Sequence, residues 1–158
     1  MSNKRYPQRK SPRLQGYDYT QSGAYFVTIC THTMAHWFGD CTGGAMVLSP
    51  MGRIAADCWA AIPEHFAVVE LDVAVVMPNH IHGIVVLTGG GVALGTIVGT
   101  YKAAVTRQIR RECSAPPATI WHTRYHDHII RSERALERIR EYILHNPARW
   151  HADTFYRP

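Results

Sequence analysis

Two histidines separated by one residue, His80 and His82, have a spacing that suits metal binding. They follow Met77-Pro78-Asn79, a tripeptide that favours a tight turn between two runs rich in β-branched residues. Because successive side chains of a strand point to opposite faces, both imidazoles project to one side while Ile81 points into the core. Two neutral imidazoles on one face can hold a divalent ion.

A second pair with the same spacing, His126 and His128, shows that the pattern alone is weak. The chain has 10 His in 158 residues, and chance gives roughly 0.6 such pairs at this frequency. The setting favours the first pair, because the apolar Ile81 separates its histidines, whereas the charged Asp127 separates those of the second. The alternative for the first pair is a set of hydrogen-bonded polar groups beside a turn.

Further side chains suited to chemistry lie on the last predicted helix, which begins after Ser132 as its N-cap and ends at Asn146, before Pro147. Tyr142 and Asn146 are four residues apart and therefore lie on one face of that helix. If the helix crosses the sheet near the histidine strand, Asn146 offers an amide oxygen to the ion and Tyr142 offers a phenol as nucleophile. The alternative for Tyr142 is that it is a core aromatic residue whose hydroxyl is hydrogen-bonded. Tyr125 is a rival nucleophile, but no metal-compatible amide lies four residues after it.

Strands and helices alternate around these residues. Apolar and β-branched runs predict strands over 24–31, 46–48, 68–77 and 80–87 and a strand or extended segment over 120–130, and residues 32–45 are expected to form a loop. Helical periodicity predicts helices over 50–62, 94–112 and 132–146, with Trp59 and Tyr101 on apolar stripes as core residues. The tightly joined pair of strands over 68–87 is antiparallel, so the predicted fold class is α+β, a mainly antiparallel sheet with helices packed on it.

Length and composition bound the kind of protein. A chain of 158 residues suits one domain with a substantial core. Residues 1–23 are polar, basic and interrupted by prolines, which predicts an N-terminal arm before a single domain over 24–158. No apolar run approaches the roughly 18 residues of a membrane span, so we expect a cytoplasmic protein with no membrane contact. The 4 Cys lack paired C-x-x-C spacing, which argues against a zinc knuckle or a redox dithiol.

Charge is segregated along the chain, and both ends are basic. Residues 1–13 carry five basic and no acidic residues, residues 14–101 carry one basic residue against six acids, and residues 102–158 carry eleven basic residues against six acids. This pattern suits a polyanionic partner, of which nucleic acid is the commonest. The alternative is a set of solvated faces with a flexible tail. The candidate DNA-contacting residues are Lys4, Arg5, Arg9, Lys10 and Arg13 in the arm and Lys102, Arg107 and Arg110 in the helix over 94–112.

Three motifs occur in an order and spacing that resemble a known family. They are Met-Pro-Asn-His-Ile-His-Gly over 77–83, Trp-His-Thr-Arg-Tyr-His-Asp-His-Ile-Ile-Arg over 121–131, and Tyr-Ile-Leu-His-Asn-Pro over 142–147. Together they resemble the HUH single-tyrosine transposases, and most closely the REP-associated tyrosine transposases within them. Segments 9–19 and 25–28 also fit, so the resemblance covers most of the chain. One departure is His122, which stands where the family pattern has a glutamine.

The resemblance implies a catalytic domain with an RRM-like sheet and a divalent metal ion, Mg²⁺ or Mn²⁺, held by His80, His82 and Asn146. It also implies that Tyr142 cleaves and rejoins single-stranded DNA, beside a hairpin, through a 5′-phosphotyrosine intermediate. The alternative function is a non-catalytic module that binds single-stranded DNA or RNA, and a third reading is a metal-dependent hydrolase that uses water. Monomers and homodimers both occur among such proteins, so the oligomeric state stays open. When bound to DNA, the protein is expected at the nucleoid.

The predicted metal ligands lead to two further expectations, one about the identity of the ion and one about pH. Two imidazoles and one amide oxygen suit Mn²⁺ better than Mg²⁺, and Zn²⁺ is less suited because it favours four close ligands. Because a histidine must be neutral to bind a metal, activity is expected to fall as the pH drops below about 6.5.

Overall fold

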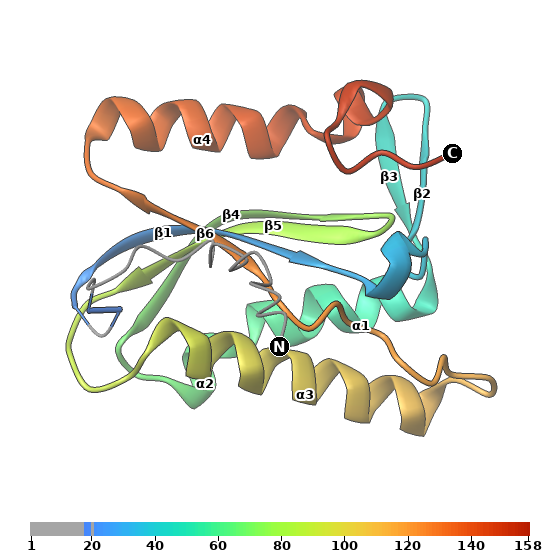
Figure 1. The fold of residues 1–158 in the computed structure, drawn as a ribbon, viewed down its shortest axis with the longest axis horizontal. Helices are drawn as coiled ribbons and strands as arrows, with labels where there is room; N and C mark the ends of the chain where they lie inside the picture. The colour runs from blue at the N-terminus through green and yellow to red at the C-terminus, as the bar shows by residue number, and fades with distance from the viewer. Residues whose placement is uncertain (1–17, 20) are drawn as a thin grey trace, which may run out of the picture.

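A computed structural model describes residues 18, 19 and 21–158 of the protein. Most of the predicted arm, with its candidate DNA contacts Lys4, Arg5, Arg9, Lys10 and Arg13, lies outside the described residues. Helices pack on both faces of one sheet in the described part of the chain (Figure 1).

The main sheet has four strands, β1 (Gly23–Cys30), β4 (Val69–Met77), β5 (His80–Leu87) and β6 (His126–Ile130). Their order across the sheet is β4-β5-β1-β6, and every neighbouring pair is antiparallel. A separate hairpin consists of β2 (Gly39–Thr42) and β3 (Ala45–Leu48). The predicted α+β class, with a mainly antiparallel sheet, is therefore confirmed.

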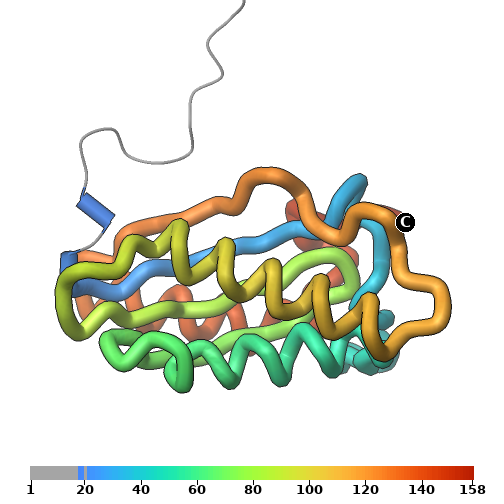
Figure 2. The backbone as a smooth tube through the Cα atoms, turned by 90° about the horizontal axis from the view of Figure 1, so that it is seen from below, coloured from blue at the N-terminus to red at the C-terminus, as the bar shows by residue number. Residues whose placement is uncertain are grey.

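Helices on the two faces divide the molecule into layers. α1 (Pro50–Ala60), α2 (Ile62–His65) and α3 (Leu94–Glu112) lie on one face, and α1 and α3 run side by side there (Figures 1 and 2). α4 (Glu133–His145) and the short 3-10 helix η2 (Pro147–Ala152) lie on the other face (Figure 1). A further 3-10 turn, η1 (His32–Met34), follows β1. The sheet therefore separates α3 from α4.

Local sequence signals place two of these helices as predicted. The Ser49 side chain accepts a hydrogen bond from the Gly52 backbone at the start of α1, and Ser132 accepts one from Ala135 at the start of α4. Each bond satisfies a backbone donor that a helix start leaves free.

The main hydrophobic core lies between the sheet and the helices α1, α2 and α3. Trp59 and Tyr101 are buried in it, as predicted. The Trp59 ring packs against β5 at Gly83, where an added Cβ would lie 2.2 Å from a ring carbon. A residue with a side chain cannot occupy this position without moving the Trp59 indole.

One part of the sequence prediction is wrong, and a second is only partly regular strand. Residues 39–42 form strand β2 rather than a loop, paired with β3 across the Gly43–Gly44 turn. The strand or extended segment expected over 120–130 is a regular strand only over 126–130, and an isolated bridge between Trp121 and Thr31 precedes it. The segment before β6 packs against α3 instead, because Trp121 Nε1 donates to the Lys102 carbonyl and Lys102 Nζ donates to the His122 carbonyl.

None of the helices in the described part of the chain is both long enough and apolar enough to span a membrane.

Candidate active site

The two motif histidines lie at the start of β5, immediately after the turn that joins it to β4. His80 is 0% exposed and His82 is 1% exposed, and their ring centroids lie 4.4 Å apart. Ile81 points to the opposite face and is part of the hydrophobic core. The strand therefore presents both imidazoles on the face that carries α4, as the spacing predicts.

Hydrogen bonds from neighbouring residues orient both rings. His80 Nδ1 lies 2.7 Å from Asn79 Oδ1, and His82 Nδ1 lies 2.8 Å from Thr28 Oγ1. The Asn79 amide nitrogen donates to the Phe155 carbonyl, which identifies Asn79 Oδ1 as the acceptor from His80. His80 therefore carries its proton on Nδ1 and keeps a lone pair on Nε2, the arrangement of a histidine that binds a metal.

Asn146 and Asp153 lie beside His80. Asn146 Nδ2 donates to Asp153 Oδ2 over 2.7 Å, and the same carboxylate oxygen lies 4.0 Å from His80 Nε2. Among the described residues, neither His80 Nε2 nor Asn146 Oδ1 has a hydrogen-bond partner, although both atoms are buried. Unpaired buried lone pairs are costly, and a cation between these atoms would satisfy them.

Asp153 is the residue of this site that sequence reasoning missed. Ligand atoms of His80, His82 and Asp153 all lie within 4.8 Å of one another, so these three residues could hold a metal ion. Asp153 comes after Pro147, in the segment that follows η2. The sequence offered no spacing rule for it, because its position depends on how this segment folds back over the sheet.

Tyr142 lies on α4 with its hydroxyl directed at the histidines. Its Oη lies 3.5 Å from His82 Nε2, and its ring meets Phe26 edge-on with centroids 6.0 Å apart. The side chain is 39% exposed, so it is not a core aromatic residue. Burial raises the pKa of the phenol, the Asp153 carboxylate raises it further, and the Asn146 amide lowers it. The phenol is therefore protonated at neutral pH, and attack requires that it lose this proton.

Burial also sets the protonation of the histidines. It lowers the pKa of His80 to about 4, against the opposing effect of the Asp153 carboxylate. Burial lowers the pKa of His82 well below its ordinary value, and the neighbouring histidines lower it further. Both rings therefore stay neutral well below pH 6.5. They become protonated at a lower pH than the ordinary pKa of histidine predicts.

An ion pair fixes α4 on the sheet. Arg140 Nε donates to both carboxylate oxygens of Asp72, in β4, over 3.1 Å. Hydrogen bonding by Arg140 lowers the pKa of the Asp72 carboxyl. Arg140 lies two residues before Tyr142, so this contact helps to hold the turn of α4 that carries the phenol against β4.

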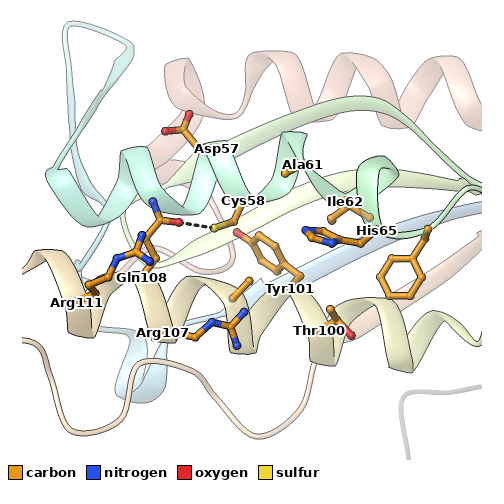
Figure 3. A pocket seen from close by; sticks show the side chains of 12 residues that line it. Asp57, Cys58, Ala61, Ile62, His65, Thr100, Tyr101, Arg107, Gln108 and Arg111 are labelled. Carbon is orange, nitrogen blue, oxygen red and sulfur yellow. Dashed lines mark hydrogen bonds between the residues drawn. The ribbon is translucent and has the colours of Figure 1, made fainter.

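The remaining candidates are not brought to this site. Lys102, Arg107 and Arg110 lie on α3, on the other side of the sheet, where they line a shallow hollow. Arg107 also lines a pocket between α1 and α3 (Figure 3). Tyr125 is buried in the core on that side, which removes it as a rival nucleophile. His122 is exposed, and its ring accepts a hydrogen bond from the Arg124 backbone, which stabilises the loop.

Known structures share this architecture. The structure of a REP-associated tyrosine transposase bound to a REP hairpin matches with a TM-score of 0.67 and 18% identity, over 85% of this chain and 72% of that one. A candidate transposase of Deinococcus radiodurans matches with a TM-score of 0.56 and 20% identity, over 84% of this chain and 95% of that one. The chain therefore has the fold of these two proteins.

A sequence relative places the chain in a family. An uncharacterized protein of Haemophilus influenzae is 34% identical over 94% of this chain and 93% of its own length. The chain belongs to the same family as that protein. No protein-family model matches the chain.

Proposed function

We propose that the protein is a metal-dependent enzyme that cleaves and rejoins single-stranded DNA, with Tyr142 as nucleophile. The observation that carries the proposal is the position of the Tyr142 hydroxyl, 3.5 Å from His82 Nε2 and directed at a group of buried metal-binding side chains. A phenol that only filled space would not need this position. All of these groups come from one chain.

The residues present fit a divalent cation. His80 and His82 offer Nε2 atoms, Asn146 offers its unpaired Oδ1, and Asp153 offers a carboxylate oxygen. This mixed set of nitrogen and oxygen ligands suits Mn²⁺. Because it includes the Asp153 carboxylate, it also suits Mg²⁺ better than the predicted set of two histidines and one amide does. When bound, the ion would supply positive charge to the phosphate under attack.

The chain's own groups then carry the reaction. The Tyr142 oxygen forms a bond to phosphorus, and the bond from phosphorus to the 3′ oxygen breaks. The 5′ phosphate stays joined to the tyrosine, while the 3′ oxygen leaves as a hydroxyl after taking up a proton. The phenol proton passes to water or to a nearby base. Attack by a 3′ hydroxyl on the phosphotyrosine reverses these bonds and rejoins a strand, because the phosphotyrosine conserves the bond that was cut.

The expected substrate is DNA, which several parts of the chain would contact. We propose that Lys102, Arg107 and Arg110 contact phosphates from α3, with the basic residues of the arm as further contacts. A structural neighbour is bound to a REP hairpin, which supports a hairpin-containing substrate here. Such an enzyme acts at the nucleoid, in the cytoplasm.

A covalent-capture experiment tests the proposed function. End-labelled hairpin oligonucleotides with randomised single-stranded flanks are incubated with the protein and Mn²⁺, and adducts are resolved on a denaturing gel. We expect an adduct with the wild-type chain, none with Tyr142→Phe, and an unchanged yield with His65→Ala, an exposed residue on α2. An adduct that persists in Tyr142→Phe would reject the nucleophile. Salt-dependent binding without any adduct would indicate the non-catalytic module, and cleavage without an adduct would indicate a hydrolase that uses water.

Metal binding is tested separately from cleavage. Calorimetric titration with Mn²⁺ is expected to show one site, with affinity reduced at least about tenfold by Asp153→Asn and lost in His80→Ala. Equal affinity of Asp153→Asn and wild type would remove Asp153 from the ligand set.

A further inference from the structure

The second histidine pair of the sequence lies beside the candidate active site. Thr28 of β1 is opposite His82 on one side and opposite His126 on the other. Two residues away in each strand, Phe26 is opposite His128. Because side chains alternate along a strand, Phe26, His126 and His128 share the face that carries His82. We call these three residues the β1–β6 strip.

The strip is open to an incoming ligand in the part of the chain that the structure describes. α4 packs on β4, the edge strand farthest from β6, where Arg140 binds Asp72. His126 and His128 are exposed, and Phe26 is partly exposed. Asp127, between the two histidines, points to the opposite face, so the strip carries no acidic side chain of its own.

The strip is also continuous with the nucleophile. The Tyr142 ring meets Phe26 edge-on at 6.0 Å, and the Phe155 ring lies 6.1 Å from His126 and 5.7 Å from His82. A DNA strand whose phosphate lies at the Tyr142 hydroxyl therefore has its next nucleotides above aromatic and imidazole rings. Such rings on an open sheet face stack unpaired bases without regard to sequence.

We propose that the β1–β6 strip binds the single-stranded DNA next to the phosphate attacked by Tyr142, by stacking bases on Phe26 and His128 and by contact with His126. The inference rests on the proposed function and deepens it, because it specifies how the substrate is held. Single-stranded DNA is the occupant rather than duplex, since only unpaired bases expose the ring faces that these side chains can stack on.

Binding measurements test the strip without requiring cleavage. Fluorescence anisotropy compares a labelled oligo(dT) strand with an abasic strand of the same length, with Tyr142→Phe as the background protein. That background is expected to prefer oligo(dT). Adding His126→Ala and His128→Ala is expected to reduce this preference by about fivefold or more, because one stacked base contributes about fivefold to a hundredfold in affinity. His128→Tyr, which keeps an aromatic ring, is expected to retain the preference.

The matched control is His65→Ala, which removes an exposed imidazole from α2 on the other side of the sheet (Figure 3). It is expected to leave the preference unchanged. Circular dichroism of each variant confirms folding, and exposed histidines are chosen because their loss leaves the core intact. An oligo(dT) preference that is equal in the double-histidine variant and in the His65→Ala control would overturn the proposal.

The outcome is separable from that of the proposed function. If the wild-type chain forms the Tyr142 adduct while the double-histidine variant keeps the full oligo(dT) preference, the strip proposal alone fails. If no adduct forms but the preference depends on the strip, the cleavage proposal alone fails.

Discussion

The buried histidines make the stability of the metal-free protein depend on pH, and His80 allows the size of the effect to be worked out. In the unfolded chain its pKa is near 6.5, whereas burial lowers it to about 4 in the folded protein. Between these two values the unfolded state binds more protons than the folded state, so the free energy of unfolding falls as the pH is lowered. The difference corresponds to about 3 kcal/mol. His82, whose pKa is lowered in the same direction, adds to the loss.

Urea unfolding in the presence of EDTA, followed by circular dichroism from about pH 7 to about pH 4.5, measures most of this loss, because the window ends just above the folded-state pKa. Asp72 also has a lowered pKa, and its contribution is lost at lower pH still, so the comparison is made between proteins rather than between pH values alone. We expect His80→Gln to be less sensitive to pH than the wild type, and His65→Gln to match the wild type. The reasoning is refuted if the wild type and His80→Gln lose the same free energy over this window.

Three further substitutions test how the site is held. Asp72→Ala removes the partner of Arg140, so α4 should shift and the adduct yield should fall, with a stability loss of about 1 kcal/mol by urea unfolding because the pair is partly exposed. Gly83→Ala forces a Cβ against the Trp59 ring and should lower stability by about 1–3 kcal/mol, and an unchanged unfolding midpoint would contradict the packing described. Ser49→Ala removes the cap of α1 and should cost about 1 kcal/mol while leaving Mn²⁺ affinity unchanged, which calorimetry can check.

Local signals in the sequence were enough to place most of the elements. The caps at Ser49 and Ser132, the turn before His80 and the apolar stripe through Tyr101 each depend on neighbouring residues, and the structure has these elements where they were predicted. The irregular segment before β6 has a different origin. Residues 120–125 have strand-like alternation, but Trp121 finds a hydrogen-bond partner on α3, so tertiary contacts override the local pattern.

Local spacing also predicted which side chains of the candidate site would lie near one another, while their roles stay a prediction. The spacing of His80 and His82 on a strand, and of Tyr142 and Asn146 on a helix, fixes which side chains share a face, and the structure brings the two faces together. Spacing could not reveal Asp153, because its carboxylate reaches His80 only through the fold of the segment after η2. Nor could it show that α3, with its basic residues, lies on the opposite side of the sheet from Tyr142.

The contact between Gly83 and Trp59 has a consequence for how this protein can change under selection. Gly83 directly follows His82, yet its substitution would disturb the Trp59 ring of α1 and the core beneath the sheet rather than the candidate metal site. In a library of variants screened only for soluble expression, position 83 should therefore strongly favour glycine, while position 82, which is buried, should admit several uncharged residues of similar volume. Screening the same library for the covalent adduct should then restrict position 82 as well, so that two adjacent codons report separately on folding and on chemistry.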